Sequence, residues 1–130
     1  MRHLTFAEVA DLARLACGGE PPAVRDPGLL ASAVHRPRAR MFGVEAYGDD
    51  VFAGAGALLH AIAANHPLVD GNKRTAWLAA VVFLALNGVD LRSADQDAAY
   101  ELVVGVASGV VSDPGAIGAA LAALAAGCGP

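Results

Sequence analysis

The sequence predicts an all-α protein, a compact bundle of six helices with one small β-hairpin flap. Apolar residues make up 55% of the chain and charged residues 17%, a balance that favours a folded core over disorder. Most apolar residues recur at helical spacing, and strand-forming residues are almost confined to one short stretch. A length of 130 residues suits a single domain over residues 1–130.

Capping residues mark the first two helices. Thr5 and Glu8 have the spacing of a capping box at the start of an apolar helical pattern, which ends at Gly18-Gly19. Asp26-Pro27 then supplies an N-cap and a first-turn proline for a short helix from Gly28 to His35. We therefore expect two helices, joined by a loop, near the start of the chain.

The stretch from Arg36 to Asp50 is the least helical part of the sequence, because proline and glycine interrupt it. It begins with a basic run that we interpret as a solvated face rather than as contacts to a nucleotide or a target. The run consists of Arg36, Arg38 and Arg40. The residues that follow, and that predict the hairpin flap, are Met41, Phe42, Gly43 and Val44.

Two longer helices are expected after the flap. Asp49 or Asp50 can cap a helix over Val51 to Asn65, whose apolar residues form one stripe. The next helix, from Asn72 to Leu86, is apolar on nearly all sides. A helix of that kind is normally buried, so we expect it to be central in the bundle.

Two further helices complete the expected bundle. Ser93 and Gln96 resemble a second capping box, for a helix that ends near Val106. Asp113-Pro114 opens a last helix, which ends before Gly127. The strand pattern is almost confined to the flap, so an α/β sheet architecture has little support.

Composition and charge exclude several classes of protein. The longest apolar run, Ala76 to Leu86, is far shorter than the roughly 20 residues of a membrane-spanning helix, and the N-terminus lacks a hydrophobic signal core. Cys17 and Cys128 lie near opposite ends, without the spacing of a metal or redox site. The net charge of −4 argues against broad attraction to nucleic acid. We expect a cytoplasmic protein that binds neither nucleic acid nor a membrane.

The residues with the clearest chemical potential lie between the two longest helices, from His66 to Arg74. A loop before a helix N-terminus presents free N–H groups and the positive end of the helix dipole, which together bind anions. Gly71 lets the backbone approach a phosphate closely. Lys73 and Arg74 add two cations that could clamp phosphate groups.

The same segment contains the other parts that phosphoryl transfer requires. His66 is the candidate general base, and Asp70 is the candidate magnesium ligand. Gly71 and Asn72 are the candidate backbone cradle for an anion. Magnesium needs only one or two protein carboxylates when phosphate oxygens and waters complete its shell, so Asp70 alone is sufficient.

Each of these residues also has an ordinary structural explanation. In isolation, His66 could be a helix-terminal histidine bonded to a backbone carbonyl, Asp70 a helix cap and Lys73-Arg74 a solvated helix start. Trp77, which follows in the apolar helix, is interpreted as a core residue. Three other histidines are interpreted as surface or satisfied side chains rather than metal ligands: His3, His35 and His60. Only the conjunction of residues 66–74 predicts a functional site.

The segment His66-Pro-Leu-Val-Asp70-Gly-Asn72-Lys-Arg74 resembles the signature of the Fic/Doc family in its Doc-like form. The resemblance extends to the segment from Arg25 to Pro37, to Met41-Phe42-Gly43 in the flap and to Thr75-Ala76. It implies the helical Fic/Doc fold. Leu68 stands where the family usually has phenylalanine, and we expect it to anchor the loop in the core as a smaller side chain.

Two positions set the reaction that the resemblance implies. Adenylyltransferases of the family normally have glycine where Lys73 stands and a second arginine where Trp77 stands. Lys73 is expected to fill part of the space that accepts the distal phosphates, which favours a kinase over a nucleotidyltransferase. ATP is then the substrate, Asp70 holds Mg²⁺ and His66 deprotonates a threonine of the target.

The resemblance also implies partners. Translation elongation factor Tu is the family's known target for the Doc-like form, and residues 41–44 of the flap would align its backbone by strand addition. No segment resembles the family's self-inhibitory helix, so we expect a separate antitoxin chain. Two alternatives stay open: a Fic-type adenylyl- or other nucleotidyltransferase that modifies a protein hydroxyl, and a non-catalytic binding module.

Overall fold

The computed structural model describes residues 1–19 and 24–128, and in this part of the chain it contains the six expected helices and the hairpin. The helices are α1 (Phe6–Ala16), α2 (Pro27–His35), α3 (Val51–Asn65), α4 (Asn72–Leu86), α5 (Gln96–Ala107) and α6 (Pro114–Ala126). The strands are β1 (Arg40–Met41) and β2 (Val44–Glu45), and a short 3₁₀ helix, η1 (Arg36–Arg38), leads into them.

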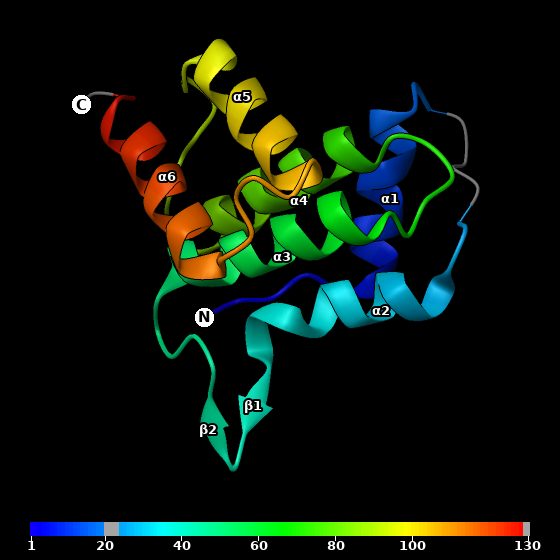
Figure 1. The fold of residues 1–130 in the computed structure, drawn as a ribbon, viewed down its shortest axis with the longest axis horizontal. Helices are drawn as coiled ribbons and strands as arrows, with labels where there is room; N and C mark the ends of the chain where they lie inside the picture. Colours follow the sequence, from blue (N-terminus) through cyan, green and yellow to red (C-terminus); the bar gives the residue numbers. More distant parts are fainter. Residues whose placement is uncertain (20–23, 129–130) are drawn as a thin grey trace.

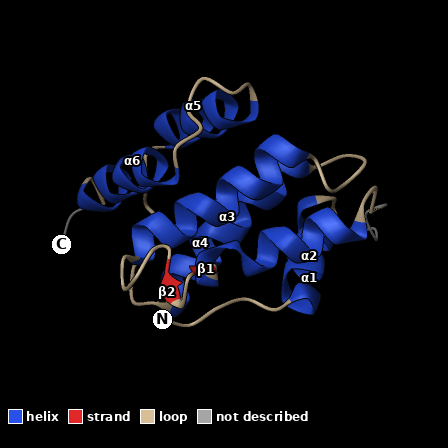
Figure 2. Cartoon of the chain, turned by 60° about the horizontal axis from the view of Figure 1, so that its bottom comes forward, coloured by secondary structure: helices blue, strands red, loops and turns tan. Residues whose placement is uncertain are grey.

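Helix α3 runs through the middle of the bundle (Figure 1). Its residues 53–59 and 61–63 are buried, and α2, α4, α5 and α6 all pack against it. Figure 2 shows α5 and α6 toward one side of α3, and α1 and α2 toward the other. The expectation that α4 is central is therefore wrong. Helix α3 takes that place because its many alanines and glycines allow neighbours on every side, whereas one face of α4 is only half-buried.

Two glycines allow a close contact between the backbones of α3 and α6. A Cβ atom added to Gly56 would lie 2.5 Å from the carbonyl oxygen of Pro114. A Cβ atom added to Gly118 would lie 2.8 Å from the backbone nitrogen of Ala53. The two backbones thus touch directly, and this contact holds α3 in place from the side of α6.

Most of the predicted caps are present. The Thr5–Glu8 capping box is formed, and Asp26, Asp50 and Asp113 each accept a hydrogen bond from a first-turn amide of the helix that follows. The capping box predicted at Ser93 and Gln96 is wrong. Helix α5 begins at Gln96 itself, because the Asp95 carboxylate accepts from the Ala98 amide at 3.0 Å and supplies the cap.

The hairpin projects from the helices as a separate arm (Figure 1). Its register pairs Arg40 with Glu45 and Met41 with Val44. Phe42 and Gly43 both have positive φ angles, 53° and 78°, as the two central residues of a tight type I′ hairpin turn require. The tip is apolar and exposed, since Phe42 is 99% exposed.

None of the helices in residues 1–19 and 24–128 has the length and hydropathy to span a bilayer. Over the same residues, no three potential metal-ligating side chains gather into a cluster. Cys17 and Cys128 form no disulfide in the described part of the chain.

Candidate active site

The segment from His66 to Arg74 forms the connection between α3 and α4 and the first turn of α4. His66 is the C-cap of α3 and has a left-handed backbone (φ 52°, ψ 58°). Gly71 is the N-cap of α4 and is also left-handed (φ 79°). Between them, Leu68 is 1% exposed and anchors the loop in the core, as predicted. The loop thus begins and ends at a left-handed residue, and the buried Leu68 fixes its middle to the core.

Asn72 stabilises the loop from inside. Its side chain is buried, its Oδ1 accepts from the Leu68 amide at 3.0 Å, and its Nδ2 donates to the Leu68 carbonyl at 2.9 Å. Both polar ends of the amide are therefore used within the loop. The side chain shapes the cradle, and only the Asn72 backbone N–H is available to an anion.

The N-terminus of α4 is uncapped. In the described part of the chain, the backbone N–H groups of Asn72, Lys73 and Arg74 have no hydrogen-bond acceptor, because Gly71 has no side chain to cap them. The Gly71 N–H donates to Oδ1 of Asp70 at 2.8 Å. Three free donors at the positive end of a helix dipole are an arrangement that favours anions, and they lie where the sequence predicts an anion-binding site.

The candidate residues share one cavity of about 650 Å³. It is lined by the end of α1 and by the loop, namely Ala16, Cys17, Gly18, His66, Val69, Asp70, Gly71, Asn72, Lys73 and Arg74. All six predicted residues from the signature therefore lie around the same space. The flap residues 41–44 do not line it, and neither do the three arginines of the basic run.

Cys17 is a lining residue that the sequence analysis did not assign. A Cβ atom added to Gly71 would lie 2.9 Å from its Sγ atom, so the thiol packs against the cradle glycine. No motif connects the end of α1 to the loop, since the two meet only in the folded chain. A signal for Cys17 was therefore absent from the sequence pattern.

The imidazole of His66 is oriented by its own helix. Its Nδ1 atom lies 3.0 Å from the carbonyl oxygen of Ala64. Because a carbonyl can only accept a hydrogen bond, the neutral ring carries its proton on Nδ1. The lone pair is then on Nε2, at the free edge of the ring, where a general base needs it.

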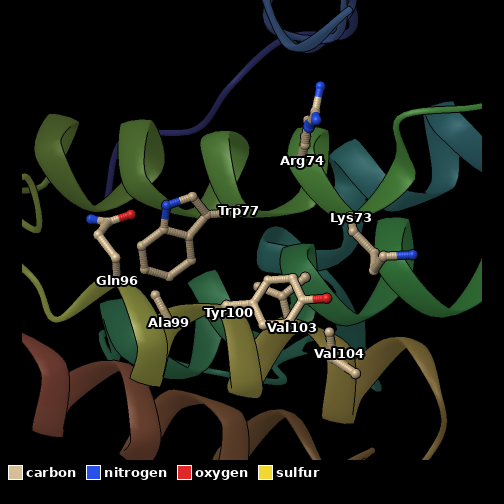
Figure 3. A pocket seen from close by; sticks show the side chains of 8 residues that line it. All are labelled: Lys73, Arg74, Trp77, Gln96, Ala99, Tyr100, Val103 and Val104. Carbon is tan, nitrogen blue, oxygen red and sulfur yellow. The ribbon is translucent and has the colours of Figure 1, made fainter.

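A second cavity of about 440 Å³ lies between α4 and α5. Trp77 from α4 and Tyr100 from α5 border it, with Gln96 near the indole (Figure 3). Lys73 and Arg74 line both cavities, so the two spaces adjoin at the start of α4. The interpretation of Trp77 as a core residue holds only in part, since it packs on the core but is half-buried and borders this cavity.

Comparisons with known proteins identify the family of this chain. The model of the Fic/DOC family matches residues 3–84, which include the hairpin and the whole loop. The chain is 49% identical over 107 residues to "Toxin Doc" of Mycolicibacterium smegmatis, covering 82% of this chain and 81% of the relative. It is 35% identical over 116 residues to "Protein kinase doc" of Escherichia phage P1, covering 86% and 87%. This chain therefore belongs to the Fic/Doc family.

Proposed function

We propose that this chain is a Doc-like toxin kinase, which transfers the terminal phosphate of ATP to a hydroxyl of a protein. The observation that carries the proposal is the shared cavity, where His66 lies with three free amides of α4 and with Lys73. This combination brings a base, an anion cradle and a cation to one space. The names of the two relatives, a toxin and a protein kinase, support the same function.

In the proposed reaction, Nε2 of His66 accepts the proton of the target hydroxyl. The hydroxyl oxygen attacks the terminal phosphorus of ATP, the bond from that phosphorus to the bridging oxygen breaks, and ADP leaves. The free N–H groups of Asn72, Lys73 and Arg74 stabilise the charge on the transferred group, and the two side-chain cations add to this effect. Gly71 keeps the backbone before these amides left-handed, and the Cys17 thiol packs where its Cβ atom would stand.

The residues of the loop also fit a magnesium ion. The Asp70 side chain is exposed, and its Oδ1 atom accepts one bond from the Gly71 amide, whereas Oδ2 has no partner among the described residues. A single carboxylate is a usual protein contribution to Mg²⁺ when phosphates and waters supply the other ligands. Asp70 would hold the ion, which when bound neutralises charge on the phosphates of ATP.

Lys73 supports terminal phosphate transfer rather than nucleotidyl transfer. Its side chain extends from the first turn of α4 at the border of the two cavities (Figure 3). At that position it takes part of the space that, in the family's adenylyltransferases, accepts the phosphates beyond the transferred group. The aromatic cavity beside it, bordered by Trp77 and Tyr100, provides space for the nucleoside of ATP.

The proposed target is a threonine of elongation factor Tu, whose modification arrests translation in the cytoplasm. The exposed hairpin supports a target contact, because Met41, Phe42 and Val44 are 69%, 99% and 68% exposed. Exposed apolar groups next to free strand edges favour pairing with another chain. From the resemblance to the Doc-like form of the family, we also propose that a separate antitoxin chain inhibits the enzyme.

The proposal is tested by incubating the purified chain with elongation factor Tu, Mg²⁺ and ATP, and by measuring the intact mass of the factor. We expect its mass to increase by one phosphate, and label from the terminal phosphate of ATP to be retained. His66→Ala should lower the rate about 10²- to 10⁴-fold, the usual contribution of a general base. His35→Ala is the matched control, since His35 is exposed and lies outside the cavity.

Two results would contradict the kinase proposal. A mass increase of one nucleoside monophosphate would identify a nucleotidyltransferase. An unmodified factor, together with equal toxicity of the parent and His66→Ala in growing cells, would identify a non-catalytic binding module.

A further inference from the structure

The backbone of His66 adopts a conformation that its side chain does not favour. Its φ angle of 52° places it in the left-handed region, which glycine occupies most easily at the end of a helix. A histidine keeps this conformation only if several surrounding contacts together hold its backbone there. The source of those contacts lies outside the signature segment, in the residues before α2.

Arg25 supplies the strongest of these contacts. Its Nε atom donates to the His66 carbonyl at 2.7 Å, and its Nη2 atom donates to the Asn65 carbonyl at 2.8 Å. One rigid guanidinium thus bridges two consecutive carbonyls at the C-terminus of α3. The last turn of α3 contains no basic residue of its own, so Arg25 also provides the cation that a helix C-terminus favours.

Backbone pairing adds to the same clamp. The amides of Arg25 and Asp26 both donate to the Pro67 carbonyl, at 2.8 and 3.0 Å. Val24 forms an isolated antiparallel bridge with Leu68. Residues 24–26 therefore run alongside the chain immediately after His66. Together with the Arg25 side chain, this pairing holds the peptide groups on both sides of His66.

We propose that Arg25 is a positioning residue for His66, and the role rests on the function proposed above. By fixing the carbonyls of Asn65 and His66, Arg25 keeps the His66 backbone left-handed. That backbone places the imidazole so that Nδ1 donates to the Ala64 carbonyl and Nε2 is left as the basic nitrogen of a ring that lines the cavity. Arg25 itself does not line the cavity, so it acts on the reaction only through His66.

The inference predicts a specific change in kinetics. Arg25→Gln should lower kcat for phosphate transfer by about 10- to 100-fold, because small misplacements of a catalytic group have effects of that size. The KM for ATP should stay unchanged, since the phosphate cradle belongs to α4. Arg25→Lys should fall between the parent and Arg25→Gln, because lysine keeps the charge but cannot bridge two carbonyls with a planar fork.

A second measurement reports on His66 without catalysis. Long-range ¹H–¹⁵N spectra of the imidazole distinguish the Nδ1-protonated tautomer from the Nε2-protonated one. We expect the parent to hold the Nδ1-protonated form and Arg25→Gln to shift toward a mixture. Arg38→Gln is the matched control, because Arg38 also donates from Nη2 to a backbone carbonyl, that of Leu4 at 3.3 Å, away from the cavity.

The two measurements separate the possible failures. If Arg25→Gln keeps the parent kcat and the parent imidazole spectrum, the positioning role is wrong. If Arg38→Gln produces the same losses, the effect is one of general stability and the role is also wrong. If the parent transfers no phosphate, the proposed function fails, and the spectra alone decide whether Arg25 orients His66.

Discussion

At the scale of single residues, position 71 in the loop before α4 favours glycine for two separate reasons. Its φ angle of 79° is in the left-handed region, which costs a residue with a Cβ atom roughly 1–2 kcal/mol. A Cβ atom there would also lie 2.9 Å from Sγ of Cys17. The glycine is therefore required both by the backbone and by the packing of α1 against the loop.

These two contributions can be separated with a double-mutant cycle. Gly71→Ala should destabilise the fold and weaken ATP binding, and Cys17→Ala should recover part of both losses because it removes the clashing sulfur. Gly88→Ala is the matched control, since Gly88 follows the same helix with φ 90° and has no atom within 4 Å of its added Cβ. Unfolding in urea and ATP titration measure the effects. Additive losses in the double variant would show that the contact with Cys17 is unimportant.

At the scale of helices and strands, local signals predicted most of the fold. Thr5, Asp26, Asp50 and Asp113 cap helices where the sequence placed caps, because a cap depends on a few neighbouring residues. The cap of α5 was misplaced because both Ser93 and Asp95 are suitable residues, and periodicity alone does not choose between them. The central place of α3 was also missed, since it depends on how closely its neighbours can approach.

The contact between α3 and α6 gives a prediction about stability. Gly118→Ala should destabilise the protein by about 1–3 kcal/mol, the usual cost of overpacking, because its Cβ atom would meet the backbone of α3 at 2.8 Å. Gly105→Ala in α5 is the matched control, with its nearest atom, Cγ2 of Val111, at an ordinary 3.5 Å. It should be neutral or stabilise by up to about 1 kcal/mol, because alanine favours a helix. Urea unfolding followed by circular dichroism compares the two, and equal midpoints would contradict the role of this contact.

At the scale of the whole molecule, the sequence indicated the residues of the candidate site better than the residues that hold its loop in place. The signature from His66 to Arg74 is continuous, so its residues could be assigned together, and they share one cavity. Cys17 and Arg25 reach the loop from α1 and from the segment before α2. Those contacts depend on tertiary packing across more than 40 positions of sequence, for which no local pattern exists.

The surroundings of the histidines outside the site also depend on tertiary packing, which the sequence pattern does not reveal. His35 is exposed, as predicted, but the expectation of surface or satisfied side chains is wrong for His3 and His60. Their Nδ1 atoms are buried without a hydrogen-bond partner in the described residues. Burial lowers the pKa of His60 from 6.5, and nearby Arg36 lowers it further.

Burial likewise lowers the pKa of His3 from 6.5. Arg38, the N-terminus and His35 lower it further, and Glu45 opposes them. Both rings are therefore held neutral in the folded chain more strongly than in the unfolded chain.

The stability of the protein should consequently decrease in mild acid. Between the lowered folded pKa values and 6.5, the unfolded chain binds more protons at His3 and His60 than the folded chain does, so the free energy of unfolding rises with pH. The contribution is complete above about pH 6.5 and is lost as the pH falls through that window. Urea unfolding from pH 5 to 8 measures how steeply the free energy of unfolding rises with pH. This rise should be smaller in the double variant His3→Gln, His60→Gln than in the parent. An identical slope would mean that the two rings accept protons equally well in the folded and unfolded chains.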